Sequence, residues 1–249
     1  MKNFQQFRFF NQTYLFKFKI GFTLFCAFFL ILFFLLGIWQ LHRYHFKQVL
    51  LSTYQHESTA EPKPLSQVLA TTQFQRVVVK GHYLNQLTMF IQNRFYKNQP
   101  GYEVLTPLKI PGEKKLLLIN RGWVGEVSEK QLPVIAKVTD EQKITGYIKL
   151  ANEYQFILGK NILQPNQSPL VMQKVDLEEI SQLTHQEFYP FILRLNPTDK
   201  NGFVRDWTVA TVEPGRHLGY AVQWFLMTLV LFIAYFCFCI ERVKSSDSK

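Results

Sequence analysis

The sequence predicts a membrane-anchored α+β protein, in which two transmembrane helices flank a mainly antiparallel β domain with one short helix. Two long apolar runs without a charged residue lie near the two ends of the chain. Short segments rich in β-branched and aromatic residues fill the part between them. The composition agrees with this prediction, because 47% of the 249 residues are apolar and 24 are Phe, a heavy apolar load for a soluble domain.

The two apolar runs extend from Ile20 to Leu41 and from Leu218 to Ile240. Each is long enough to cross a hydrocarbon core of about 30 Å as a helix. The first run has no polar face, as a core helix of a small domain would need. It is also longer than the apolar part of a signal peptide and ends at Trp39–Arg43 without a small-residue cleavage site. We therefore predict that it is an uncleaved anchor.

Basic residues dominate both tails, which hold seven Lys and Arg against two acidic residues. Because basic flanks stay in the cytoplasm, both ends should be cytoplasmic and the central part outside. The leading tail is rich in Phe and Gln, unlike a mitochondrial transit peptide, so we expect a bacterial cytoplasmic (inner) membrane. The predicted parts are a cytoplasmic tail 1–19, transmembrane helix 20–41, periplasmic β-rich domain 42–217, transmembrane helix 218–240 and cytoplasmic tail 241–249.

The three cysteines, Cys26, Cys237 and Cys239, all lie in the apolar runs. The outer domain therefore has no thiol, which excludes a Cys-based copper carrier or a thiol oxidoreductase there. The net charge of +10 is dispersed, without the basic and aromatic clustering of a nucleic-acid interface. Nucleic acid is therefore not an expected partner.

Within the outer domain, the first helix is expected to continue from Tyr44 to about Gln55, since no Gly or Pro interrupts it. A short helix is expected at 176–183, where acidic residues fill the first turn. The other elements should be strands of a barrel-like or sandwich-like sheet. The expected strands are 76–80, 88–92, 102–106, 115–120, 143–150, 188–195 and 204–212.

Five strings of the sequence carry a family resemblance: Gly37–Lys47, Val79–Tyr83, Pro100–Leu108, Ile119–Val124 and His217–Phe225. In this order, they resemble the surfeit-locus family of cytochrome c oxidase assembly proteins. They depart from the family pattern at Gln223, where Thr is usual, and the resemblance is thin over 158–197. The resemblance implies a chaperone role in maturing a haem-copper oxidase, handling haem a or stabilising the catalytic subunit, with that subunit and other assembly factors as partners.

A candidate haem site lies where both apolar runs reach the outer boundary. A haem needs an imidazole for its iron, flat apolar walls and basic groups near its propionates. The resemblance, in which the histidine of the second anchor has been proposed to bind haem, makes His217 the candidate iron ligand, with His42 as runner-up. Equally, Trp, Tyr, His and Arg populate any membrane interface, so interfacial packing is the competing interpretation. The other candidate haem-binding residues are Trp39, Arg43, Arg216, Tyr220 and Trp224.

The string Asn120-Arg121-Gly122-Trp123 ends a predicted strand. One interpretation is a contact with the oxidase or another assembly factor. The other, which we favour, is a strand-to-turn junction where Gly122 supplies special backbone angles and Trp123 packs on the sheet.

Three classes of function compete with an assembly factor. The chain has no nucleotide-binding, zinc-protease or serine-hydrolase motif, so we do not expect an enzyme. A membrane enzyme would also need ionisable residues inside its spans, and the two apolar runs contain no charged residue. A sensor would need a larger cytoplasmic output segment than the nine residues after the second run. The remaining alternative is a membrane-anchored binding or scaffold module with no cofactor role.

Overall fold

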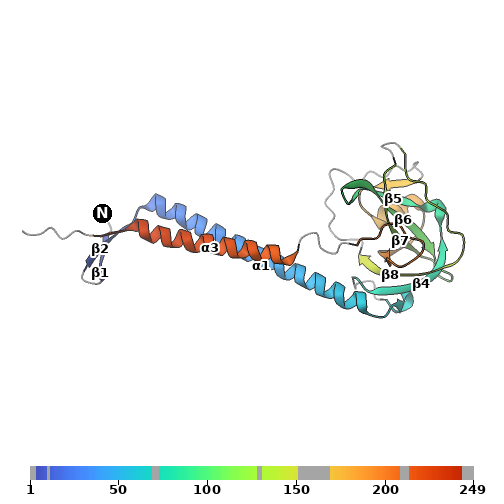
Figure 1. The fold of residues 1–249 in the computed structure, drawn as a ribbon, viewed down its shortest axis with the longest axis horizontal. Coiled ribbons are helices and arrows are strands. Elements are labelled where there is room, and N and C mark those ends of the chain that lie inside the picture. The colour runs from blue at the N-terminus through green and yellow to red at the C-terminus, as the bar shows by residue number, and fades with distance from the viewer. Residues whose placement is uncertain are drawn as a thin grey trace, which may run out of the picture. The chain divides into compact units, whose positions relative to one another are not determined.

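The computed structural model describes residues 4–9, 12–68, 73–127, 131–150, 169–207 and 213–242. They form two compact units. The first unit comprises Met1–Leu51 and Ala210–Lys249, and the second comprises Ser52–Val209. Helices dominate the first unit and strands the second (Figure 1).

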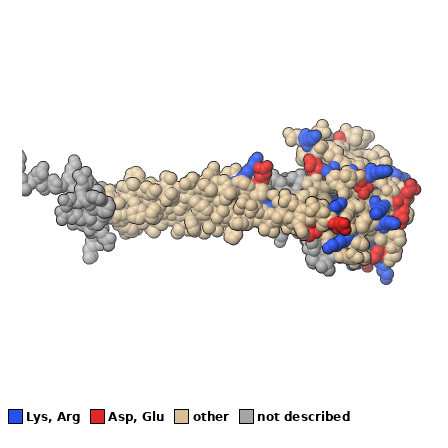
Figure 2. Space-filling model, turned by 60° about the horizontal axis from the view of Figure 1, so that its bottom comes forward, with Lys and Arg blue, Asp and Glu red and all other residues tan. Residues whose placement is uncertain are grey.

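The helical unit pairs the first part of α1 (Ile20–Thr59) with α3 (Pro214–Cys239), which run alongside each other (Figure 1). Both helices are long and apolar enough to cross a membrane, and Figure 2 shows little charge along this part of the molecule. The residues shielded between them include series at steps of three and four, the spacing of helices packed at a shallow angle. We call these residues the seam: Thr23, Cys26, Leu30, Phe33, Gly37 and Gln40 on α1, and His217, Ala221, Trp224, Thr228, Leu231 and Tyr235 on α3.

Close approach of the two helices depends on Gly37. A Cβ atom at this position would lie 2.6 Å from Cε1 of Phe225, closer than any carbon contact allows. Thr23 and Tyr235 form a second link across the seam, a hydrogen bond of 3.0 Å between their hydroxyl groups. A small residue with interhelical hydrogen bonds is a common way to pair helices in lipid.

The ends of these helices differ from the predicted limits. Continuation of the first helix past the apolar run is confirmed, and it extends beyond Gln55 to Thr59. The second begins four residues before Leu218, because Pro214 suits the first helical turn, where its missing N–H costs nothing. The tails hold strands that the sequence did not predict: β1 (Phe4–Phe9), β2 (Gln12–Lys17) and β11 (Ile240–Arg242), paired antiparallel in the order β1-β2-β11.

The second unit is built on a closed ring of five strands. Its strands pair in the order β4-β8-β10-β7-β6, and β4 closes the ring by pairing with β6. The barrel alternative of the sequence prediction is therefore confirmed. The ring strands are β4 (Arg76–Tyr83), β6 (Gln99–Lys109), β7 (Leu116–Gly125), β8 (Gln142–Leu150) and β10 (Phe188–Leu195). The remaining elements are β3 (Lys63–Pro64), β5 (Met89–Tyr96), β9 (Leu170–Met172) and the 3-10 turns Leu65–Gln67 and Asn85–Leu87.

Most strand pairs are antiparallel, as predicted, but three are parallel: β3 with β4, β5 with β9, and β10 with β7. One predicted strand is wrong over its described part. Of residues 204–207, Val204 alone takes part in a β-bridge, an isolated one to Trp123. Residues 208–212 of that prediction lie outside the described residues.

The sheet separates two apolar cores. The inner core lies within the ring and includes Leu117, Ile119 and Leu193. The outer core lies between the ring and α2 (Leu177–Thr184) and includes Leu116 and Leu118. Successive β7 residues enter opposite cores, as the two-residue period of a strand requires. Because both faces of β7 are covered, its sequence is a continuous apolar run rather than an alternating one.

The short helix α2 confirms the prediction at 176–183. The Asp176 side chain accepts a hydrogen bond from the Glu179 backbone N–H at 3.2 Å, and so caps the helix N-terminus. The helix buries Ile180 completely in the outer core. Cap and burial together fix α2 on the sheet.

Candidate functional site

A hydrogen bond joins the two helices where both apolar runs end. Nδ1 of His217 lies 2.8 Å from Oε1 of Gln40, and both side chains are partly buried. Both residues belong to the seam, so each side chain is held between helices rather than exposed to lipid. The outer ends of the two apolar runs therefore meet at one level of the helix pair.

Trp39 and Arg43 lie beside Gln40 on α1. A helix turns about 100° per residue, so both residues are on one flank of the seam, away from its centre. Their side chains are exposed, with 52% of the Trp39 surface accessible. The runner-up ligand, His42, is also exposed, and points further from the seam by the same count.

Arg216 and Tyr220 occupy the corresponding flank of α3 beside His217. Because the two helices run antiparallel, this flank and that of Trp39 and Arg43 lie on the same side of the helix pair. The opposite side is marked by Phe34 and Phe225, whose rings lie 5.8 Å apart. One side of the helix pair therefore carries Trp39, Arg43, Arg216 and Tyr220, around the imidazole of His217.

The two candidate tryptophan walls lie at different depths. The Trp224 ring packs 5.6 Å from Phe33 on the seam. Phe33 and Trp39 are six residues apart, or about 9 Å along the helix axis. Trp39 thus lies near the level of His217 and Trp224 lies deeper, so the two rings cannot face each other across one flat group.

The predicted partner motif 120–123 is held by contacts within the barrel. Asn120 and Arg121 are both only 3% exposed. The Asn120 amide donates to a carboxylate oxygen of Glu103 at 2.6 Å. Its own carbonyl oxygen accepts from the Gly122 backbone N–H at 3.1 Å. These interactions support the structural interpretation, while a role in partner contact remains a prediction.

Arg121 fastens the segment that follows β10 to the barrel. Its Nε donates to the Asn201 carbonyl at 2.9 Å, and its guanidinium lies between the rings of Tyr83 and Phe203, 5.0 and 4.9 Å from their centroids. Burial lowers the pKa of Arg121 and raises the pKa of Tyr83 above its usual value. The site is thus an internal anchor, too enclosed to receive a ligand.

Gly122 and Trp123 complete this anchor within β7, not at the end of a strand as predicted. A register shift at Val104–Leu105 of β6 leaves an extra residue in β7 here, and Gly122 adopts a φ of 113°, which confirms its special backbone angles. Trp123 packs on the sheet, as predicted: its Nε1 donates to the Arg94 carbonyl at 3.1 Å, and its ring lies 5.4 Å from Tyr96.

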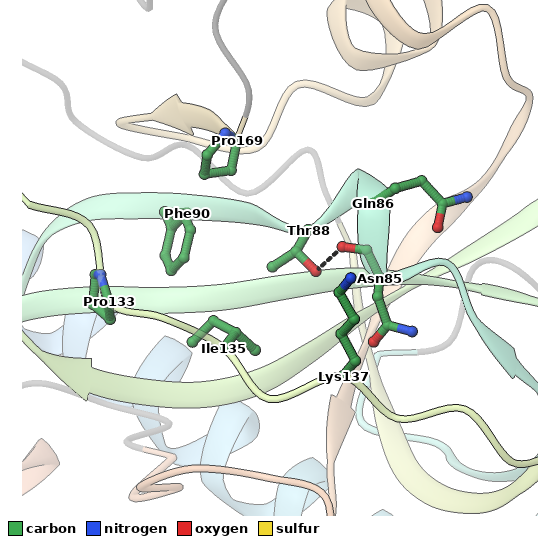
Figure 3. Close-up of a pocket in the computed structure, with 8 residues that line it drawn as sticks. All are labelled: Asn85, Gln86, Thr88, Phe90, Pro133, Ile135, Lys137 and Pro169. Carbon is green, nitrogen blue, oxygen red and sulfur yellow. Dashed lines mark hydrogen bonds between the residues drawn. The ribbon is translucent and has the colours of Figure 1, made fainter.

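A hollow of about 220 Å³ on the barrel is a weaker candidate site (Figure 3). Two of its polar residues, Asn85 and Thr88, already have partners. Asn85 bonds the backbone N–H and carbonyl of Val138 at 3.0 Å each, and the Thr88 hydroxyl bonds the Asn85 carbonyl at 2.9 Å. The hollow is therefore a junction between segments. Its lining residues are Asn85, Gln86, Thr88, Phe90, Pro133, Ile135, Lys137 and Pro169.

No group of three or more His, Cys, Asp or Glu side chains that could hold a metal ion occurs in the described residues. The single imidazole of His217 is therefore a candidate for one axial bond, not for a complete metal cage. The sequence did not predict that Gln40 belongs to the candidate haem site, nor that Glu103 contacts the 120–123 motif. Gln40 could have been found as a polar residue inside an apolar run, because such residues need a partner.

Comparison with known proteins covers both units. The SURF1 family model matches residues 27–229. The chain is 25% identical over 209 residues to the SURF1-like protein of Rickettsia bellii, covering 81% of this chain and 83% of the relative. It is 24% identical over 228 residues to surfeit locus protein 1 of Takifugu rubripes, covering 84% and 93%. The cytochrome oxidase assembly protein SHY1 of Saccharomyces cerevisiae is 32% identical over 105 residues, which cover 40% of this chain and 26% of SHY1. Because the family match includes the barrel and most of both apolar helices, this chain belongs to the SURF1 family.

Proposed function

We propose that this chain is an assembly factor for a haem-copper terminal oxidase. Membership of the SURF1 family carries this proposal, since the match spans residues 27–229 and one relative is named a cytochrome oxidase assembly protein. The catalytic subunit of the oxidase and other assembly factors are the proposed partners. The protein acts as a chaperone, not as an enzyme.

The proposed location is a bacterial cytoplasmic membrane with both termini in the cytoplasm. Two helices long and apolar enough to span support this, as do the basic tails. Reporter fusions test the topology: an alkaline phosphatase fused after Lys249 should be inactive, and one inserted at Asp140 should be active. The reverse pattern would invert the orientation.

Haem a is the proposed cofactor, and the chemistry of His217 fits it. When bound, haem would supply an iron that an imidazole nitrogen can ligate. One ring nitrogen of His217 is engaged by Gln40 at 2.8 Å, and the other remains for the iron. Arg43 and Arg216 would hold the propionates at the water boundary, and Trp39 and Tyr220 would line the apolar part. Trp224 would contact only its deeper edge.

A competing function is a scaffold that holds the catalytic subunit and binds no cofactor. The buried contacts of the 120–123 motif favour a rigid barrel, which serves a scaffold and a haem carrier equally. The two functions differ in what His217 does. In the scaffold, the imidazole links helices and contributes nothing to haem.

Replacement of His217 by Ala in the full-length protein, expressed in cells that make haem a and lack the native gene, separates the two. We expect purified wild type to carry a haem absorption spectrum and His217→Ala to lose it, with a fall in haem a content of the oxidase. His45→Ala is the matched control, because His45 is exposed on α1 and lies off the seam. No spectrum in either protein, with oxidase assembly intact, would favour the scaffold. Normal oxidase levels without the gene would refute the assembly role.

A further inference from the structure

The Gln40–His217 hydrogen bond determines which ring nitrogen of the imidazole carries the proton. The Gln40 amide oxygen faces Nδ1 of His217 across 2.8 Å. Since that oxygen can only accept, the two atoms form a hydrogen bond in the tautomer whose Nδ1 carries the hydrogen. A neutral imidazole has one N–H. The other nitrogen, Nε2, therefore keeps its lone pair.

The surroundings of this bond favour one of the two ring nitrogens as its donor. Gln40 and His217 sit on the seam, where the neighbouring helix restricts their side-chain rotation, and Gly37 lets the helices come close one turn deeper. Among the described residues, no second hydrogen bond to either side chain is present, and the neighbouring side chains of Trp39 and Arg216 are exposed. An isolated histidine at a membrane boundary would instead exchange between both tautomers with water.

We propose that Gln40 is a positioning residue, which holds His217 as the Nδ1–H tautomer and leaves Nε2 as the coordinating nitrogen. The inference rests on the haem role proposed above for His217, and it assigns to Gln40 a function that the family match does not. Histidines that bind metals generally donate their other N–H to a carbonyl or carboxylate, and loss of that partner weakens metal binding about 10–100-fold. Gln40 supplies such a carbonyl from the facing helix.

The alternative is that the bond only holds the two helices together. Tyr235 provides the matched control for this, because its hydroxyl bonds Thr23 across the same seam at 3.0 Å, far from His217. Tyr235→Phe removes one interhelical hydrogen bond and leaves the imidazole untouched. A variant that merely loosens the helix pair should therefore behave as Tyr235→Phe does.

Nitrogen NMR of the full-length, haem-free protein in detergent micelles, labelled with 15N at histidine, tests the inference directly. His217 is assigned by its loss in His217→Asn, and the shifts of its two ring nitrogens report the tautomer. We expect Nδ1–H in wild type and in Tyr235→Phe, and a shift to the Nε2–H form in Gln40→Leu. Gln40→Glu, which keeps an accepting oxygen, should restore Nδ1–H. An unchanged tautomer in Gln40→Leu would overturn the inference, as would an equal change in Tyr235→Phe.

Titration with hemin on the same variants separates this inference from the haem role. We expect Gln40→Leu to bind hemin about 10–100-fold more weakly than wild type, and Gln40→Glu and Tyr235→Phe to bind within a few-fold of it. If the tautomer responds to Gln40 but neither wild type nor any variant binds hemin, the haem role fails while control of the ring by Gln40 stands. If hemin affinity falls without a change of tautomer, the haem role stands and the positioning inference fails.

Discussion

Replacement of Gly122 by Ala tests how the anchor in β7 is built. Two separate costs should add at this position. The first is the backbone angle, since φ is 113° and a residue with a Cβ atom is strained there. The second is space, since the new Cβ would lie 2.6 Å from the Val204 carbonyl oxygen, a backbone atom that cannot rotate away.

The size of each cost follows from the contacts. A non-glycine residue at positive φ costs about 1–2 kcal/mol. Moving Val204 away would also break its two hydrogen bonds with the Trp123 backbone, which measure 2.7 and 3.1 Å and contribute about 1 kcal/mol each. We therefore expect Gly122→Ala to lower the unfolding free energy of the barrel by about 3–4 kcal/mol.

Gly112→Ala separates the two costs. Gly112 has a φ of 82°, but a Cβ there would meet nothing within 4 Å, so this variant incurs the backbone cost alone. Thermal unfolding of the full-length protein in detergent, followed by near-UV circular dichroism, should show a fall in Tm of about 2–8 °C for Gly112→Ala and about 6–16 °C for Gly122→Ala. Equal shifts would refute the reasoning, because the Val204 carbonyl would then contribute nothing.

Two further predictions concern the barrel. Asp176→Ala removes the side chain that caps α2 and should lower the unfolding free energy by about 1 kcal/mol, measured by the same thermal assay, whereas Asp176→Asn, which keeps an accepting oxygen, should remain within a few tenths of wild type. Burial raises the pKa of both Tyr83 and Tyr147 in the folded protein, which favours their neutral forms there. Their contribution to the unfolding free energy is therefore complete below the unfolded-state pKa of about 10. The unfolding free energy should therefore fall as pH rises above 10, and a pH titration of urea unfolding should show a shallower fall in Tyr83→Phe; an identical slope would contradict the assignment to burial.

The elements that depend on local pattern could be predicted from the sequence. The apolar runs became α1 and α3, the acidic turn after Asp176 became the start of α2, and residues 188–195 became β10 with the predicted limits. Each of these relies on composition or spacing within a few residues. Such signals survive folding because no distant contact is needed to produce them.

Features that depend on distant partners could not be predicted. The strands β3 and β9 span only two and three residues and exist because β4 and β5 pair with them. Nothing local marks the parallel pairing of β10 with β7. The segment at Val204 has the residue types of a strand, yet its backbone is taken up by the Arg121 anchor. Here tertiary contacts override β propensity.

The candidate site likewise has some features that follow from local sequence and others that depend on distant partners. Spacing placed Trp39 with Arg43, and the ends of the two apolar runs predicted that His217 would lie near their level. It could not show that Gln40 bonds the imidazole, because partners on different helices depend on the crossing of the pair. Nor could it show that Trp224 lies deeper than Trp39. Residues of one helix can be ordered by counting, but their neighbours across the seam cannot.

The two hydrogen bonds across the seam restrict how the helix pair can move. Thr23 and Gln40 are 17 residues apart on α1, and Tyr235 and His217 are 18 apart on α3, or about 26 Å on each helix. A piston-like slide of one helix by even one residue, about 1.5 Å, would stretch both bonds at once. Bending or rotation about the seam keeps at least one of them. The two hydrogen bonds therefore oppose sliding of one helix along the other. Such a pair is unsuited to signalling by translation and suited to holding His217 at a constant depth in the membrane.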